Sequence, residues 1–251
     1  MPKAVLVTGS ARRIGRQIAL DLAADGWDVG VHCNTSIAEA EEVVGLVGRM
    51  GRRAVMVRGD LADPAVPERL VVEASRALGG LTCLINNASV FEPDVVGSIT
   101  QASWGQHLNT NLRAPVFLSQ AFARQLPGTA IGNIISIIDQ RVWKLTPKFF
   151  SYTASKSALW TVTRTLAQAL APRIRVNAIG PGPALPSVRM DEEEFAKQSR
   201  LTLLGRATSP AEISAAVKFI LSQPALTGQM IVLDGGQHLA WATADVTEVN
   251  E

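Results

Sequence analysis

Short runs of apolar residues alternate along this chain with longer segments in which apolar positions recur at helical spacing. An uninterrupted apolar run of this kind is typical of a strand that is buried on both faces of a parallel sheet. The runs predict seven strands, at residues 4–7, 28–33, 54–57, 81–85, 131–138, 174–179 and 230–233.

The segments between these runs predict helices at 14–24, 38–50, 63–78 and 210–222. Pro64 would occupy the first position of the third helix, and Gly79 would follow its end. Residues 100–126 have a helical pattern with a break near 109–115, and a further helix begins at Tyr152. Strands and helices in this alternation indicate an α/β fold, a doubly wound parallel sheet with helices on both faces.

The chain reads as a single domain over 1–251, because one α/β domain of this length is common. Residues 183–209 are rich in proline and carry an acidic run at 191–194. We expect the run to be a solvated face and the segment to be a mobile lid over a substrate.

Composition narrows the class of protein. The 24 basic and 22 acidic residues give a net charge of +2 without a long basic run, which argues against a nucleic-acid partner. Cys33 and Cys83 lie in expected strands and the three histidines are dispersed, so we expect no metal site. Neither a signal peptide nor a membrane span is evident, so a cytoplasmic protein with a small-molecule substrate is expected.

The first strand runs into a turn with Gly9 and Gly15 and then into a helix. Such a turn can hold a dinucleotide pyrophosphate on backbone N–H groups, although two glycines alone are a weak signal. Arg12, Arg13 and Arg16 lie where the helix dipole disfavours cations, and a bound phosphate would reverse that penalty. The alternative is three solvated arginines.

The end of the second strand favours NADPH over NADH. It contains His32, Asn34 and Ser36 but no acid, whereas NAD-binding folds usually place Asp or Glu there for the ribose 2′-hydroxyl. We expect Arg13 to offer its fork of donors to the 2′-phosphate.

Tyr152 and Lys156 are spaced so that they project from one face of a helix. A free phenol titrates near pH ~10, and a neighbouring ammonium would lower that pKa. Tyr152 could then transfer a proton near neutral pH. An isolated pair of this kind is more often a surface feature, but Tyr152 is the only tyrosine in the chain.

Five motifs together resemble the short-chain dehydrogenases/reductases: the glycine turn, residues 86–88, Asn111, Tyr152 with Lys156, and residues 181–182. The resemblance covers nearly the whole chain. It implies a seven-stranded Rossmann sheet, hydride transfer with a nicotinamide cofactor, and a homotetramer. Tyr152 would be the proton donor, Lys156 would hold the nicotinamide ribose, and Asn111 would keep a water linked to Lys156.

The same resemblance implies a set of cofactor contacts. Asp60 would meet the adenine and Asn87 would border the ribose. The full set is Gly9, Arg12, Arg13, Ile14, Gly15, His32, Asn34, Ser36, Asp60, Leu61, Asn87, Ala88, Ser89, Tyr152, Lys156, Pro181 and Gly182.

At three positions the chain departs from the general family pattern, and at each it resembles the pteridine reductases. This subgroup includes bacterial dihydromonapterin and dihydrofolate reductases. Arg13 replaces the middle glycine of the turn, Ser89 replaces the glycine after residues 86–88, and Asp139 replaces the catalytic serine. In that subgroup the arginine contacts cofactor phosphate, and a phenylalanine at the position of Phe91 stacks on the pterin. Ser89, Phe91, Asp139 and Tyr152 would therefore contact the substrate.

Alternatives remain open. The chain could be a short-chain reductase of another carbonyl or imine, or a non-catalytic NADP-binding protein. Phe91 could be a core aromatic, and Asp139 could orient a pterin as a charged acceptor instead of passing a proton. The tetramer is favoured by excess apolar residues at 100–125 and 150–171, including Ala158, Leu159, Trp160 and Val162.

Overall fold

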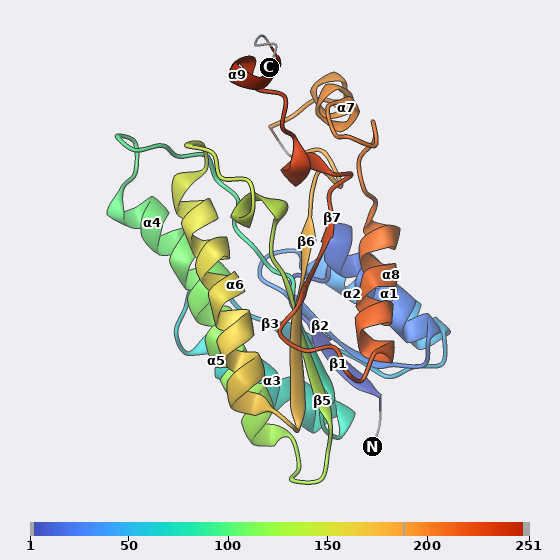
Figure 1. Cartoon of the computed structure of the whole chain (residues 1–251). Helices are drawn as coiled ribbons and strands as arrows, with labels where there is room; N and C mark the ends of the chain where they lie inside the picture. The colour runs from blue at the N-terminus through green and yellow to red at the C-terminus, as the bar shows by residue number, and fades with distance from the viewer. Residues whose placement is uncertain (1–2, 188, 248–251) are drawn as a thin grey trace.

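A computed structural model describes residues 3–187 and 189–247. Seven parallel strands form one sheet, as the sequence predicts, and the structure shows their order to be β3-β2-β1-β4-β5-β6-β7 (Figure 1). Position 188 of the expected lid and residues 1–2 and 248–251 lie outside the described residues. The strands are β1 (Ala4–Val7), β2 (Asp28–Cys33), β3 (Ala54–Arg58), β4 (Cys83–Asn86), β5 (Gly132–Ile137), β6 (Ile174–Pro181) and β7 (Met230–Leu233).

Helices cover both faces of this sheet (Figure 1). One face carries α1 (Arg13–Ala24), α2 (Ile37–Arg49) and α8 (Pro210–Ser222). The other carries α3 (Val66–Leu78), α4 (Gln101–Leu108), α5 (Ala114–Gln125) and α6 (Phe150–Leu170). The chain therefore has the doubly wound α/β architecture that the alternation of its elements predicts.

The first strand shows why the apolar runs are continuous. Val5 and Val7 belong to the core beneath α1, α2 and α8, whereas Ala4 and Leu6 belong to the core beneath α3 and α5. Successive side chains of a strand point to opposite faces, so every position of a strand covered on both sides must be apolar.

The strand order reverses between β1 and β4, which are neighbours in the sheet although two strands separate them in the chain. In open α/β sheets, ligands bind in the crevice outside the carboxyl ends of the strands at such a switch point. The turn after β1 and the segment after β4 are therefore brought together at the expected position of a site.

One helix prediction was wrong in detail. The helix expected from residue 63 begins at Val66, because the Asp60 and Asp63 carboxylates accept hydrogen bonds from the backbone N–H groups of Ala62 and Ala65 and form turns instead. The proline in the first turn of α3 is Pro67.

The α-helical pattern is interrupted near 109–115, as expected, but the chain does not leave the helix there. A π-helical segment, Asn109–Arg113, joins α4 directly to α5. Pro115 does not interrupt the path because it lies in the first turn of α5, where a missing N–H is tolerated.

Above the carboxyl edge of the sheet lie α7 (Glu192–Arg200), within the expected lid, and the short α9 (Ala244–Thr247) (Figure 1). The acidic run at 191–194 is exposed, as expected, and Asp191 caps the start of α7. Across residues 3–187 and 189–247, no helix combines the length and the apolar character that crossing a bilayer requires.

Candidate active site

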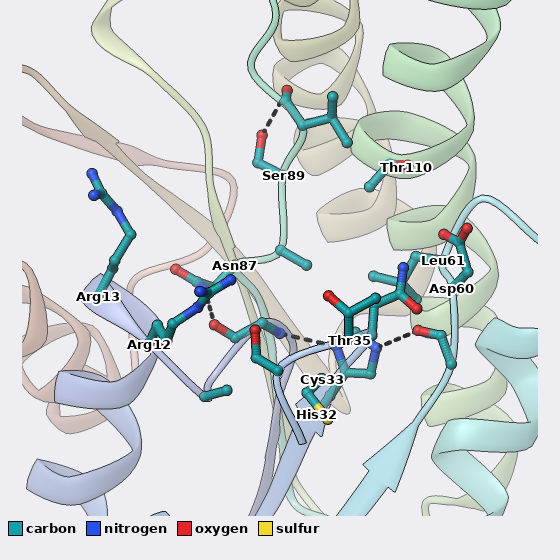
Figure 2. Close-up of a pocket in the computed structure, with 18 of the residues that line it drawn as sticks. Arg12, Arg13, His32, Cys33, Thr35, Asp60, Leu61, Asn87, Ser89 and Thr110 are labelled. Atoms are coloured by element: carbon teal, nitrogen blue, oxygen red, sulfur yellow. Dashed lines mark hydrogen bonds between the residues drawn. The ribbon is translucent and has the colours of Figure 1, made fainter. Parts of the chain in front are cut away.

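Two cavities adjoin at the carboxyl edge of the sheet. The glycine-turn cavity, of about 540 Å³, is lined by the turn after β1 and by residues that follow β2, β3 and β4 (Figure 2). The tyrosine cavity, of about 340 Å³, is lined by Phe91, Asp139, Tyr152 and Lys156 together with the lid. Arg13, Ile14, Asn87 and Ser89 line both, so the two form one continuous site.

The glycine turn is held against the segment after β4 by hydrogen bonds. The Asn87 side-chain amide donates to the carbonyl oxygens of Thr8 and Gly9, at 2.8 and 3.2 Å. A Cβ added to Gly15 would lie 2.3 Å from the Gly9 carbonyl oxygen and 2.5 Å from the Asn87 amide nitrogen. Only glycine therefore allows α1 to approach so closely, and this close approach forms the cradle that a dinucleotide phosphate requires.

His32 joins three loops of this cavity. Its Nδ1 accepts a hydrogen bond from the Gly9 N–H at 2.9 Å, so the neutral ring carries its proton on Nε2 and donates it to the Gly59 carbonyl at 3.0 Å. Burial lowers the pKa of His32, which favours this neutral form. Because both ring nitrogens are occupied, His32 lines the cavity as a structural bracket and has no nitrogen left for a cofactor.

The two arginines of the turn leave it in different directions (Figure 2). The Arg13 guanidinium donates to the lid carbonyls of Pro186, at 2.9 Å, and Leu185, at 3.5 Å. Arg12 instead lies 3.6 Å from Glu39 of α2, close to the acid-free end of β2. The contact of Arg13 with the 2′-phosphate therefore stays a prediction, and Arg12, which also lines the glycine-turn cavity, is a second candidate for that phosphate.

The remaining predicted cofactor residues fall into three groups. Asn34, Ser36, Asp60 and Leu61 line the glycine-turn cavity where β2 and β3 end, and Ala88 and Ser89 line it after β4. Pro181 and Gly182 line the tyrosine cavity at the end of β6. A Cβ on Gly182 would lie 2.6 Å from the Cβ of Asp234, so this turn also requires glycine.

Asp139 and Tyr152 form a hydrogen-bonded pair at the centre of the tyrosine cavity. The Tyr152 hydroxyl donates to Asp139 Oδ2 at 2.8 Å, and the backbone N–H of Arg141 donates to Oδ1 at 2.8 Å. Lys156 is buried one helical turn further on and donates to the Ile137 carbonyl at 2.9 Å. The structure thus brings together three of the predicted catalytic residues.

Burial dominates the electrostatics of this pair. It raises the pKa of Asp139, against the opposing effects of the Arg141 N–H and Tyr152 hydrogen bonds and of the Arg141 and Lys156 charges. It also raises the pKa of Tyr152 well above 10, and the Asp139 charge raises it further. Burial lowers the pKa of Lys156 to about 8. The expectation that Lys156 lowers the pKa of Tyr152 was therefore wrong.

Asn111 lies in the π-helical segment and is fully buried. Its side chain accepts from the Val90 N–H at 2.8 Å and donates to the Val90 carbonyl at 2.9 Å and to Ser155 Oγ at 3.1 Å. Asn111 thereby ties the segment after β4 to α6. Within residues 3–187 and 189–247, none of the hydrogen bonds of Asn111 reaches Lys156 directly, so the predicted water link stays a prediction.

Phe91 packs edge-to-face against Tyr152, with ring centroids 4.7 Å apart, and stacks on Phe149 at 4.3 Å. Arg141 lies beside both phenylalanine rings. Sequence reasoning missed Phe149 and Arg141, because their positions depend on the path of the 140–149 loop. Asp139 starts that loop by capping its first turn.

A buried polar junction fixes the start of α6, and sequence reasoning missed it too. Asp94 accepts hydrogen bonds from the Ser151 N–H, at 3.0 Å, and from the Ser151 hydroxyl. Ser151 Oγ lies 2.7 Å from His107 Nδ1, and His107 Nε2 accepts from the Glu92 N–H at 3.1 Å. The junction therefore connects α4, α6 and the 91–94 segment directly behind Tyr152.

Known proteins resemble this chain in sequence and in fold. Residues 3–198 match the family model "short chain dehydrogenase". The chain is 30% identical to a 3-oxoacyl-[acyl-carrier-protein] reductase of Staphylococcus aureus, over 95% of this chain and 99% of that protein.

Solved structures give a closer likeness. FolM alternative dihydrofolate reductase 1 from Brucella suis, in complex with NADP, is 49% identical with a TM-score of 0.94, covering 97% of this chain and 98% of that one. A short chain dehydrogenase from Burkholderia cenocepacia, also in complex with NADP, is 33% identical with a TM-score of 0.87, covering 95% and 98%. The chain therefore belongs to the short-chain dehydrogenase/reductase family, as an NADP-dependent oxidoreductase in a subgroup similar to the alternative dihydrofolate reductases.

Proposed function

We propose that this oxidoreductase reduces the C=N bond of a dihydropterin. The observation that carries the proposal is the 2.8 Å hydrogen bond between Tyr152 and Asp139, where the wider family has a serine. A serine hydroxyl suits a ketone oxygen, whereas reduction of a C=N bond must place a proton on a ring nitrogen. A carboxyl group can donate that proton when it is protonated.

NADPH supplies the hydride when it is bound, and the chain's own residues supply the proton. The raised pKa values of Asp139 and Tyr152 both favour the protonated forms. Asp139 donates to the ring nitrogen. Tyr152 then passes its hydroxyl proton to the Asp139 carboxylate along their hydrogen bond as it takes up a proton from water, so that both groups end protonated. Lys156 and Asn111 hold α6 and the segment after β4 in place around this relay.

Phe91 supports the choice of a flat heteroaromatic substrate. It follows β4 at the carboxyl edge, lines the tyrosine cavity and contacts the ring of Tyr152. An aromatic face in that place favours offset stacking with a pterin. The FolM neighbours are described as alternative dihydrofolate reductases, and dihydrofolate contains a pterin.

A substrate panel tests the reaction class. We expect NADPH oxidation with dihydropterins and dihydrofolate at a kcat/KM at least about tenfold above that with simple ketones. Faster turnover of ketones would favour the alternative of a carbonyl reductase. Retained NADPH binding without turnover of any panel member would favour a non-catalytic NADP-binding protein.

The pH dependence tests the relay. A carboxyl donor must be protonated, so kcat/KM should fall as pH rises through the pKa of Asp139. Asp139→Asn should remove that limb and lower kcat by about 10²–10⁴-fold, the range of general acid catalysis. Asp139→Ser is the matched control, because it restores the residue of the wider family and should retain ketone reduction. Equal pH profiles and rates for wild type and Asp139→Asn would exclude the relay.

We also propose a homotetramer in the cytoplasm. Phe117 on α5 is 45% exposed and Val162 on α6 is half-buried, which supports an apolar contact with another copy. Leu159 and the partly buried Trp160 contribute less, since both belong to or pack on a core cluster against the sheet. The buried free thiols of Cys33 and Cys83 suit a reducing compartment. A monomeric mass by light scattering at micromolar concentration would exclude the tetramer.

A further inference from the structure

Positive charge exceeds negative charge in the tyrosine cavity. The charged side chains that line it are those of Arg13, Asp139, Arg141 and Lys156. Three cations thus face one carboxyl group. A surplus of cations around a cavity favours an anionic ligand.

Two of the three cations have partners in the protein. Lys156 is buried and donates to the Ile137 carbonyl, and Arg13 donates to two carbonyls of the lid. The guanidinium of Arg141 has neither a hydrogen bond nor an ion pair with any residue in 3–187 or 189–247. Arg141 is therefore the cation of this cavity that is available to a ligand.

The aromatic rings beside Arg141 do not satisfy it. Its Cζ lies 5.8 Å from the Phe91 centroid and 5.0 Å from the Phe149 centroid. These two rings are stacked with centroids only 4.3 Å apart. A cation over a ring is attracted by the ring quadrupole. The rings do not neutralise the charge of the guanidinium, and its planar fork of N–H donors remains free to bind a carboxylate.

The neighbouring arginine is different. Arg189, in the lid, approaches the Phe91 ring at 5.7 Å, but its guanidinium is paired with Glu92 at 2.7 Å and donates to the Phe91 carbonyl. Arg189 therefore closes the lid against the 91–92 segment with its charge compensated. Arg141 also does not line the glycine-turn cavity, so the phosphates of a dinucleotide are not its expected partner.

We propose that Arg141 binds a carboxylate on the side chain of the substrate, so that the enzyme prefers pterins with an acidic tail over pterins with a neutral one. The proposal rests on the proposed reduction of dihydropterins. With the flat ring at the Asp139–Tyr152 pair, a side chain directed past the Phe91–Phe149 stack reaches Arg141. The planar guanidinium fork matches a carboxylate and can bind it with two parallel hydrogen bonds.

The experiment compares dihydrofolate, whose tail ends in carboxylates, with dihydrobiopterin, whose side chain is neutral. Arg141→Gln should lower kcat/KM for dihydrofolate relative to dihydrobiopterin by about tenfold, the loss of one charge-assisted bond in a partly hydrated site. Arg141→Lys should recover part of the ratio. Arg124→Gln removes an equal charge from an exposed pair with Glu68 on the surface and should leave the ratio unchanged.

Binding measured without turnover separates this proposal from the reaction. Folate and biopterin are titrated into the NADP-loaded protein and followed by tryptophan fluorescence. A preference for folate that Arg141→Gln abolishes supports the role of Arg141, even if no dihydropterin is reduced and the proposed function fails.

The opposite result is equally clear. Turnover of both substrates with a ratio that Arg141→Gln leaves unchanged would retain the function and overturn the inference. An equal loss for both substrates, with a shifted pH profile, would also overturn it. Arg141 would then act only through its charge on Asp139 and Tyr152.

Discussion

Replacing Gly15 with alanine would test whether the close approach of α1 to the glycine turn creates the cofactor cradle. The added Cβ would lie 2.3 Å from the Gly9 carbonyl oxygen and 2.5 Å from Asn87 Nδ2. Favourable contacts between such atoms lie near 3.5 Å, so the turn or the helix must move by about 1 Å. Gly15 is helical, so its backbone conformation itself would accept alanine.

The expected magnitude follows from three effects. Overpacking costs about 1–3 kcal/mol, and loss of the hydrogen bond from Asn87 to Gly9 costs about 1 kcal/mol more. The higher helix propensity of alanine offsets about 1 kcal/mol. The net loss of about 1–3 kcal/mol corresponds to a fall in Tm of roughly 2–4 °C per kcal/mol for a domain of this size.

Calorimetry and NADPH titration measure the two consequences. We expect Gly15→Ala to lower Tm by several degrees and to weaken NADPH binding at least about tenfold, because the backbone N–H groups at the start of α1 move out of place. Gly45→Ala is the matched control within α2, since its Cβ would meet only the flexible Arg49 guanidinium, at 3.6 Å. The control should raise stability by about 0.5–1 kcal/mol without changing affinity. If Gly15→Ala behaves like Gly45→Ala, the cradle argument is refuted.

Three further outcomes can be measured. Arg12→Gln should raise the KM for NADPH much more than that for NADH, whereas Arg13→Gln should raise both KM values similarly. The reverse pattern would show that Arg13 binds the 2′-phosphate. Asp139→Asn should raise Tm at pH 8 but not at pH 4. Because folding raises the pKa of Asp139, the stability that this residue contributes is present below its pKa of 3.8 in the unfolded chain. That stability is lost as pH rises through its pKa in the folded protein. An unchanged Tm at pH 8 would contradict this. Ser151→Ala should lower stability by about 1–3 kcal/mol in urea unfolding, because buried Asp94 loses a donor, and an unaltered midpoint would show that the hydroxyl contributes nothing.

The sequence predicted the sheet well, because a buried parallel strand must be apolar at every position. The bounds of β2, β7 and α8 agree with prediction to the residue. Helix starts were less accurate, since the Asp63 carboxylate forms a local turn before α3 that helical periodicity does not register. The interruption near Pro115 was located correctly but its π-helical form was not foreseen, because proline marks both a break and a first turn.

For the site, the spacing of Tyr152 and Lys156 identified the right face of the right helix. Spacing could not show that burial outweighs the ammonium in setting the phenol pKa. It also could not place Arg141, whose position beside the aromatic stack depends on the loop after Asp139. Properties set by local pattern were predictable, and those set by enclosure or by an irregular loop were not.

The buried junction behind Tyr152 contains the three side-chain types of a serine hydrolase triad, but in a different order. In a hydrolase, histidine stands between the acid and the serine and removes the serine proton. Here Ser151 stands in the middle: its hydroxyl donates to Asp94, and His107 has its proton on Nδ1, facing Ser151, because Nε2 accepts from Glu92. An imidazole protonated on that side cannot act as a base toward the serine, and Ser151 is fully buried. The direction of these two hydrogen bonds therefore leaves the serine without a base to activate it as a nucleophile. The three side chains instead anchor the start of α6.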